Sequence, residues 1–167
     1  MTTKFRVAIG AAVLCLCAAG NLAAEDRPDL DSIVCQFHIN YSNGEVAKNR
    51  ELVAGNLIVH LNGGAGNPVN GATFRGREEF VPWLERDKVT FEGGTIMNHD
   101  VVVSGNMAAI RFTLEGTHTG PVETPNGILP AAGRKVRIEG TEFFTFDDSG
   151  KLVRLETLTN DLSRSRS

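Results

Sequence analysis

The sequence has little cysteine and no apolar run long enough to span a membrane, and both shortages limit what the protein can be. Only three of the 167 residues are cysteines, and Cys15 and Cys17 fall near the N-terminus. The rest of the chain keeps Cys35 alone, so that part cannot form an internal disulfide. A chain of about 140 residues can bury enough surface to be stable without one. The apolar run at 7–19 has 13 residues, fewer than a membrane-spanning helix needs.

The sequence around this apolar run is typical of a secretory signal peptide. Lys4 and Arg6 precede the run, and the small residues Ala23 and Ala24 follow it before an acidic pair. We therefore expect residues 1–24 to be a signal peptide and the protein to be exported, either to the periplasm or out of the cell. An uncleaved anchor is the alternative. Removal of this segment leaves 15 basic and 20 acidic residues. This acidic balance argues against nucleic acid, or a membrane surface after cleavage, as a partner.

Several motifs that carry chemistry are also missing. The sequence has no H-x-H, H-E-x-x-H or C-x-x-C, so no pair of residues has the spacing typical of a metal site. It has no G-x-S-x-G elbow, which argues against a serine nucleophile. The glycine-rich loop at 63–71 lacks the spacing of a phosphate-binding loop. We therefore expect neither a metal nor another cofactor.

The order of predicted elements indicates an α+β fold. Helices come first, and a run of strands follows. Such a chain packs its N-terminal helices on a curved, mostly antiparallel sheet, which closes into a cone with a pocket between its concave face and the helices. We expect one domain over residues 25–162 and a disordered tail at 163–167. The predicted helices are 32–42, 45–54 and 76–87, the last starting as late as Pro82. The predicted strands are 56–62, 88–97, 100–104, 108–120, 135–146 and 151–161, with a loop at 121–133 and a turn at 147–150.

Alternation along three strands places titratable residues on apolar faces. In 108–120, His118 shares the phase of Ile110 and Phe112 near the end of the strand. In 135–146, Glu142 lies in the apolar phase, and in the last strand Asp161 shares the phase of the apolar Leu155. Acidic and imidazole groups in one apolar concavity are suited to general acid–base catalysis. Each of them could instead be a satisfied core or rim residue.

The other histidines are weaker candidates. His38 lies off the Ile33, Phe37 and Tyr41 line of the first helix, so we expect it at the surface. His60 is in a strand that leads into the glycine-rich loop and could line the mouth of the pocket.

Three segments resemble one known family. GTHTG at 116–120, AAGRKVRIEG at 131–140 and FFTFDDSGKLVRLETLTND at 143–161 resemble the SnoaL-like polyketide cyclases, including the ester cyclases, of the nuclear-transport-factor-two-like superfamily. The resemblance implies a cone-shaped α+β barrel, often a homodimer through its sheet. It also implies ring closure by an intramolecular aldol reaction without metal or cofactor. Asp161 falls on the family's acid–base aspartate, and Gly140 and Glu142 fall on polar pocket positions.

These observations predict an exported, cofactor-independent enzyme of the aldol cyclase or isomerase type, acting on a hydrophobic carbonyl compound. The expected catalytic residues are Asp161, Glu142 and His118. A non-catalytic module that binds a ligand or dimerises is one alternative, and a hydrolase resembling an epoxide hydrolase is another. The expected partners are a small hydrophobic molecule and a second copy of the chain. The residues expected to line the pocket are Tyr41, His60, Trp83, Phe112, Leu114, Gly140 and Phe144.

Overall fold

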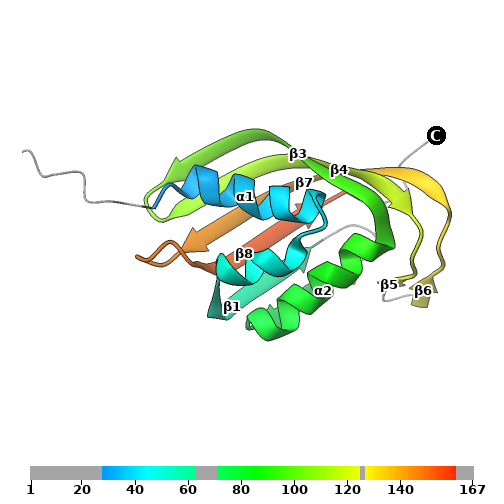
Figure 1. Cartoon of the computed structure of the whole chain (residues 1–167), viewed down its shortest axis with the longest axis horizontal. Coiled ribbons are helices and arrows are strands. Elements are labelled where there is room, and N and C mark those ends of the chain that lie inside the picture. The colour runs from blue at the N-terminus through cyan, green and yellow to red at the C-terminus, as the bar shows by residue number, and fades with distance from the viewer. Residues whose placement is uncertain (1–27, 63–70, 125–126, 161–167) are drawn as a thin grey trace, which may run out of the picture.

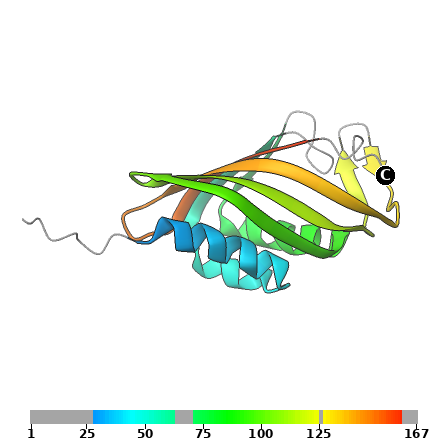
Figure 2. The ribbon, with the colours of Figure 1, turned by 90° about the horizontal axis from the view of Figure 1, so that it is seen from above.

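The structure, a computed structural model, describes residues 28–62, 71–124 and 127–160. The expected signal peptide at 1–24 and the expected tail at 163–167 lie outside these ranges. Within them, helices pack on one face of a curved sheet, which is the predicted α+β fold (Figures 1 and 2). The elements in chain order are α1 (Leu30–Ser42), the 3₁₀ helix η1 (Val46–Glu51), β1 (Val53–Asn62), β2 (Ala72–Arg75), α2 (Arg77–Thr90), β3 (Phe91–Ser104), β4 (Met107–His118), β5 (Val122–Thr124), β6 (Gly127–Leu129), β7 (Arg134–Phe146) and β8 (Leu152–Thr159).

The main sheet has six strands in the order β2-β1-β8-β7-β4-β3. Only β1 and β8 pair in parallel, and all the other neighbours are antiparallel, as predicted. The sheet stays open between its edge strands β2 and β3 and curls along its length, so that α1 and α2 lie against its concave face (Figure 2). The short hairpin of β5 and β6 forms a separate sheet at one end of the molecule (Figure 1).

Helix α1 forms where the sequence predicts it. The Asp29 carboxylate accepts a hydrogen bond from the Ser32 amide at 3.3 Å, which caps the first turn. Val34, Phe37 and Tyr41 are among its buried residues, at the three- and four-residue spacing of one helix face. This face packs on the sheet and carries polar side chains into the interior.

The boundaries of several other elements differ from the sequence prediction. The helix predicted at 45–54 is the shorter η1, and β1 already begins at Val53. The loop predicted at 121–133 contains the hairpin of β5 and β6. Helix α2 begins at Arg77 and runs through Pro82, because the buried Phe80 and Val81 hold the helix where proline removes one backbone hydrogen bond. The helix also extends to Thr90 through residues with strand preference. The predicted strands at 88–97 and 100–104 are a single strand, β3, with an irregularity between Asn98 and Asp100 in place of a turn.

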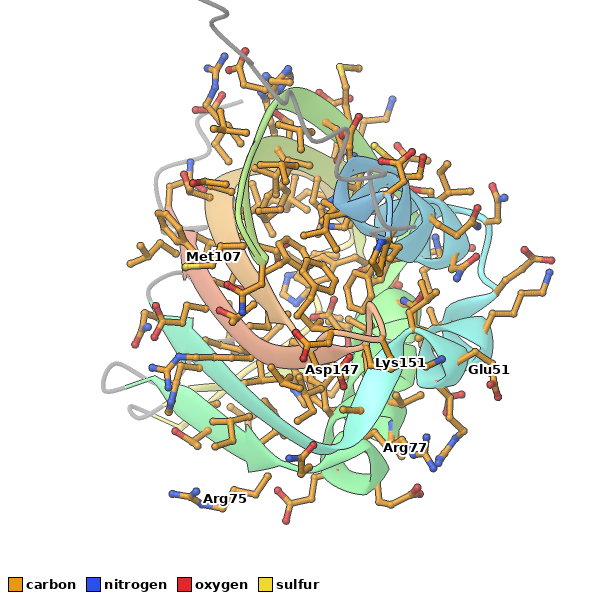
Figure 3. The ribbon with its side chains drawn as sticks, turned by 90° about the vertical axis from the view of Figure 1, so that its left-hand side faces the viewer. Glu51, Arg75, Arg77, Met107, Asp147 and Lys151 are labelled. Carbon is orange, nitrogen blue, oxygen red and sulfur yellow. The ribbon has the colours of Figure 1, made fainter. Side chains whose placement is uncertain are left out.

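The hairpin between β7 and β8 is tied to the start of β1. Asp147 accepts hydrogen bonds from the amides of Ser149 and Lys151, which fixes the predicted turn. The Lys151 ammonium donates to the carbonyl oxygen of Glu51 (Figure 3). The last strand is thereby attached to the N-terminal half of the chain.

Among the described residues, no helix combines the length and the apolar character needed to cross a membrane.

Candidate active site

A cavity of ≈ 90 Å³ lies between the two helices and the concave face of the sheet. It has room for several water molecules or part of a small ligand. Most of its wall is apolar, and the polar side chains come from α1, α2, β7 and β8. The lining residues are Phe37, His38, Tyr41, Leu61, Phe80, Trp83, Leu84, Asp87, Phe91, Ile96, Phe112, Leu114, Ile138, Glu142, Leu155, Thr157 and Thr159.

A buried histidine and a buried glutamate meet on this wall. His38 of α1 is 2% exposed and Glu142 of β7 is 8% exposed. The Nε2 atom of His38 lies 2.7 Å from Oε2 of Glu142. A carboxylate is costly to bury unless it is paired and hydrogen-bonded. The pairing with His38 therefore explains how an acidic residue occupies the apolar phase of β7.

Two further side chains orient this pair. Asn98 Oδ1 lies 2.6 Å from Nδ1 of His38, and the Thr157 hydroxyl donates to Oε1 of Glu142 at 3.0 Å. An amide oxygen only accepts, so we assign a proton to Nδ1 of His38. A second proton then lies between Nε2 and Oε2. The His38–Glu142 pair is consequently neutral overall, whichever of the two atoms holds that proton.

Aromatic rings surround the imidazole of His38. The ring centroids of Phe112 and Phe144 lie 5.5 and 6.1 Å from it, and that of Phe37 lies 6.0 Å away. Such packing restricts the ring to one orientation and keeps bulk water away from most of it. The pair is therefore held in place before any ligand arrives, which is the arrangement that proton transfer needs.

A second polar pair, Tyr41 and Asp87, lines the same cavity. The Tyr41 hydroxyl donates to Oδ2 of Asp87 at 2.8 Å, and this joins α1 to α2. Burial raises the pKa of Asp87 to about 6, against the smaller opposing effect of the Tyr41 hydrogen bond. Burial also raises the pKa of Tyr41 well above its ordinary value, so its hydroxyl keeps its proton. Asp87 therefore titrates well above the ordinary range of an aspartate.

The structure does not bring His118 to Glu142. His118 is 2% exposed, as its strand phase predicts, but it does not line the cavity. Ile110 is the β4 residue paired with Glu142, and His118 lies roughly 26 Å further along that strand at a rise of ~3.3 Å per residue. Its ring packs instead against Phe91 at 5.9 Å. Strand alternation correctly predicted that His118 lies on the buried face of β4. It carries no information on how far along the strand His118 lies from Glu142.

Four of the residues expected in the pocket line the cavity, and one catalytic candidate lies outside the described residues. Tyr41, Trp83, Phe112 and Leu114 belong to the cavity wall. Asp161 falls beyond residue 160, where the described part of the chain ends.

Three other expected positions are corrected by the structure. His60 is half-buried and meets the hydroxyl of Thr73 at 3.0 Å, because the strand alternation that turns Leu61 inward turns His60 outward. Gly140 is covered by Phe112, whose Cζ would lie 2.5 Å from a Cβ atom at that position. Phe144 fills the core beneath His38 and does not reach the cavity.

The sequence profile of the SnoaL-like domain matches residues 34–155, which include His38, Asp87 and Glu142. The chain belongs to the SnoaL-like domain family. A search of curated proteins finds no match to it.

Solved structures share the fold of this SnoaL-like domain at low sequence identity. IdmH of Streptomyces antibioticus, a proposed polyketide cyclase, is 22% identical with a TM-score of 0.63, covering 78% of this chain and 91% of its own. A proposed SnoaL-like polyketide cyclase of Jannaschia sp. CCS1 is 16% identical with a TM-score of 0.66, covering 80% and 86%. AclR of Streptomyces galilaeus, a proposed hydroxylase, is 15% identical with a TM-score of 0.63, covering 81% and 90%. At these identities the likeness establishes the fold.

Sequence reasoning missed two titratable residues of the site in this SnoaL-like domain, His38 and Asp87. His38 was expected at the surface because the apolar face of α1 was centred on Ile33, but the buried face includes Val34 and His38, four residues apart. Asp87 lies four residues after Trp83 on α2, which places both on the cavity side. In both cases the four-residue spacing to an apolar neighbour was the available indication that the side chain points into the cavity.

Within the described ranges, no group of three or more histidine, cysteine or acidic residues could hold a metal ion.

Proposed function

We propose that this SnoaL-like domain is a small enzyme that moves a proton at the carbon beside the carbonyl group of a hydrophobic substrate. The observation that carries the proposal is the His38–Glu142 pair on the wall of an apolar cavity. Enzymes of the aldol cyclase and isomerase types need a positioned base of this kind.

In this mechanism Glu142 accepts the proton. One carboxylate oxygen of Glu142 takes the proton from the substrate carbon, which leaves an enolate. In an isomerisation the same group returns the proton at another carbon. In an aldol reaction the enolate carbon attacks a second carbonyl group and closes a ring, and the alkoxide that results takes the proton back from Glu142. His38 and Thr157 hold the carboxylate, and Asn98 holds His38. These three residues act as positioning residues, and the apolar wall strengthens every charge interaction inside it.

We extend the proposal to Asp161 as a second acid–base group. Thr157 and Thr159 share its phase in the last strand of the sequence, and both line the cavity. His118 has no part in this mechanism, because it lies far along β4 from Glu142.

The test measures how fast the hydrogens beside the carbonyl group of a ketone exchange for deuterium. NMR in deuterated water monitors this exchange for a panel of hydrophobic ketones such as 2-tetralone. We expect the wild type to accelerate exchange for at least one ketone, and Glu142→Gln to lower that rate by about 10²- to 10⁴-fold. Glu139→Gln is the matched control, since Glu139 lies on the same strand but is exposed. Wild-type binding of the ketones without exchange would favour the non-catalytic module instead.

We also propose that the protein is exported, on the strength of the basic and apolar segment at 1–24. Expression of the full chain in a bacterium, followed by mass measurement of the periplasmic product, tests this. A mass that lacks about two dozen N-terminal residues is the expected result. An intact chain in the cytoplasm would contradict it.

We further propose a homodimer through the outer face of the sheet. Phe143 of β7 and Leu158 of β8 lie on adjacent strands and are 37% and 51% exposed. Light scattering should give twice the chain mass for the wild type, and Leu158→Lys should reduce it to one chain. A wild-type monomer at high concentration would reject the dimer.

A further inference from the structure

Asp87 is an acidic group in the cavity without a cationic partner. Within the described residues, the one hydrogen bond to its carboxylate comes from the neutral hydroxyl of Tyr41, and none of the ion pairs there includes it. The neighbouring Lys88 forms no ion pair with it, because the Lys88 ammonium donates to the carbonyl oxygens of Ser42 and Gly94 and lies over the ring of Tyr41, 5.1 Å from its centroid. A partly buried carboxylate with one neutral partner costs stability, and such a cost is often found where a ligand binds.

The rest of the cavity leaves this charge uncompensated. The His38–Glu142 pair is neutral overall, and no lysine or arginine is among the residues that line the cavity. The lining instead presents six aromatic rings, two of which, Phe80 and Trp83, stack with their centroids 5.9 Å apart. The faces of aromatic rings attract cations. One carboxylate among aromatic rings therefore favours a ligand with a positive charge and disfavours an anion.

We propose that the cavity selects hydrophobic molecules that carry a protonated amine, with Asp87 as the residue that binds the ammonium group. The proposal rests on the proposed function in one respect. The amine belongs to the carbonyl substrate, and its binding to Asp87 holds that substrate while Glu142 acts on it. The Tyr41 hydroxyl keeps the Asp87 carboxylate in place between α1 and α2. The ammonium group donates hydrogen bonds to Asp87 and lies against the ring of Trp83.

The chain contains an internal reporter for this binding. Trp83 is its one tryptophan and lines the cavity, so its fluorescence responds directly to occupancy. Benzylammonium and benzyl alcohol have nearly the same size and differ in charge, and phenylacetate supplies the anion. Titrated at pH 8, benzylammonium should bind at least about tenfold more tightly than benzyl alcohol, and phenylacetate should bind most weakly.

Two variants complete the test. Asp87→Asn keeps an acceptor for the Tyr41 hydroxyl and removes the charge, so the amine should lose its advantage while benzyl alcohol binds as before. Glu85→Gln is the matched control, because Glu85 is an exposed acid on the same helix, and it should keep the full preference. Equal binding of amine and alcohol by the wild type, no binding of either, or an unchanged preference in Asp87→Asn would overturn the proposal.

The two proposals fail separately. A wild type that prefers the amine but whose Glu142→Gln variant exchanges ketone hydrogens at the normal rate would retain amine selection and lose the proposed chemistry. In the reverse pattern, Glu142→Gln slows the exchange as predicted but the wild type shows no preference for the amine. That result would remove only the role assigned to Asp87.

Discussion

The imidazole of His38 and the carboxylate of Glu142 lie 2.7 Å apart although 104 positions separate the two residues in the chain. Both side chains are nearly inaccessible to solvent. Removal of one partner leaves the other without its hydrogen bond in an apolar interior. Removal of both side chains leaves neither the imidazole nor the carboxylate buried without its partner.

The first prediction follows from this relationship. His38→Leu should destabilise the protein by about 3 kcal/mol, because Glu142 is then buried without a charge partner. The double variant His38→Leu with Glu142→Leu should recover most of that loss, since neither group remains. Urea unfolding of the wild type, both single variants and the double variant measures the coupling. Additive losses would show that the two side chains do not stabilise each other.

The second prediction concerns pH and Asp87. Its pKa is raised to about 6 in the folded protein from an ordinary value of 3.8, so the folded state binds this proton more tightly than the unfolded state. The stability that the protonated form contributes is present below the unfolded value and is lost as the pH rises toward 6. The full loss is about 3 kcal/mol.

Asp87→Asn should therefore be more stable than the wild type at pH 8, with the difference shrinking below pH 5. Urea unfolding at both pH values measures it. The titratable and charged groups nearby are Tyr41, which bonds Asp87, Lys88, which lies over the Tyr41 ring, and the His38–Glu142 pair on the same cavity wall, and all are unchanged in the variant. Glu85→Gln should show no such pH-dependent gain. A variant less stable than the wild type at pH 8 would contradict the prediction.

The third prediction tests the close approach at Gly140. A Cβ atom there would lie 2.5 Å from Cζ of Phe112 and 3.0 Å from the carbonyl oxygen of Leu158. Gly140→Ala should push the Phe112 ring toward the cavity, with a loss of about 1–3 kcal/mol and weaker ligand binding. Gly55→Ala, where nothing lies within 4 Å of the added atom, is the control and should be nearly neutral. Thermal unfolding and Trp83 fluorescence follow the two effects.

The fourth prediction concerns the attachment of α1. Asn49 of η1 is fully buried, and it accepts from the Asn40 amide at 2.8 Å and donates to the carbonyl oxygen of Phe37 at 3.1 Å. Asn49→Leu should cost about 2 kcal/mol, because the Asn40 amide then has no acceptor there. Asn56→Leu, at an exposed position of β1, serves as the control. Equal stability of the two variants in urea would show that Asn49 does not anchor the helix.

Strand phase was a good guide to the inner face of the sheet. Glu142 was predicted to point inward from its apolar neighbours alone, and it does, because each side chain of a strand has only two directions available. The same argument placed His118 on the buried side. It could not tell which residues on that side lie near one another, because this depends on the register between strands, and Ile110 rather than His118 is opposite Glu142.

The helices were harder to interpret at the level of single residues. His38 was assigned to solvent because a polar residue beside the apolar line of a helix is usually exposed. Its burial depends on Glu142 and Asn98, which come from distant strands and were not predicted as its partners. Likewise, Val89 and Thr90 have strand preference but complete α2. Contacts formed only in the folded chain outweigh local preference in both cases.

The position of β8 constrains how the chain can fold. Among the described strands β8 comes last in the chain, yet it lies within the sheet, between β1 and β7. Until it emerges, β1 and β7 each keep an unpaired edge, and the walls around His38 and Asp87 cannot close. A growing polypeptide therefore cannot complete the core on the concave face of the sheet until β8 is available to pair with both of its neighbours.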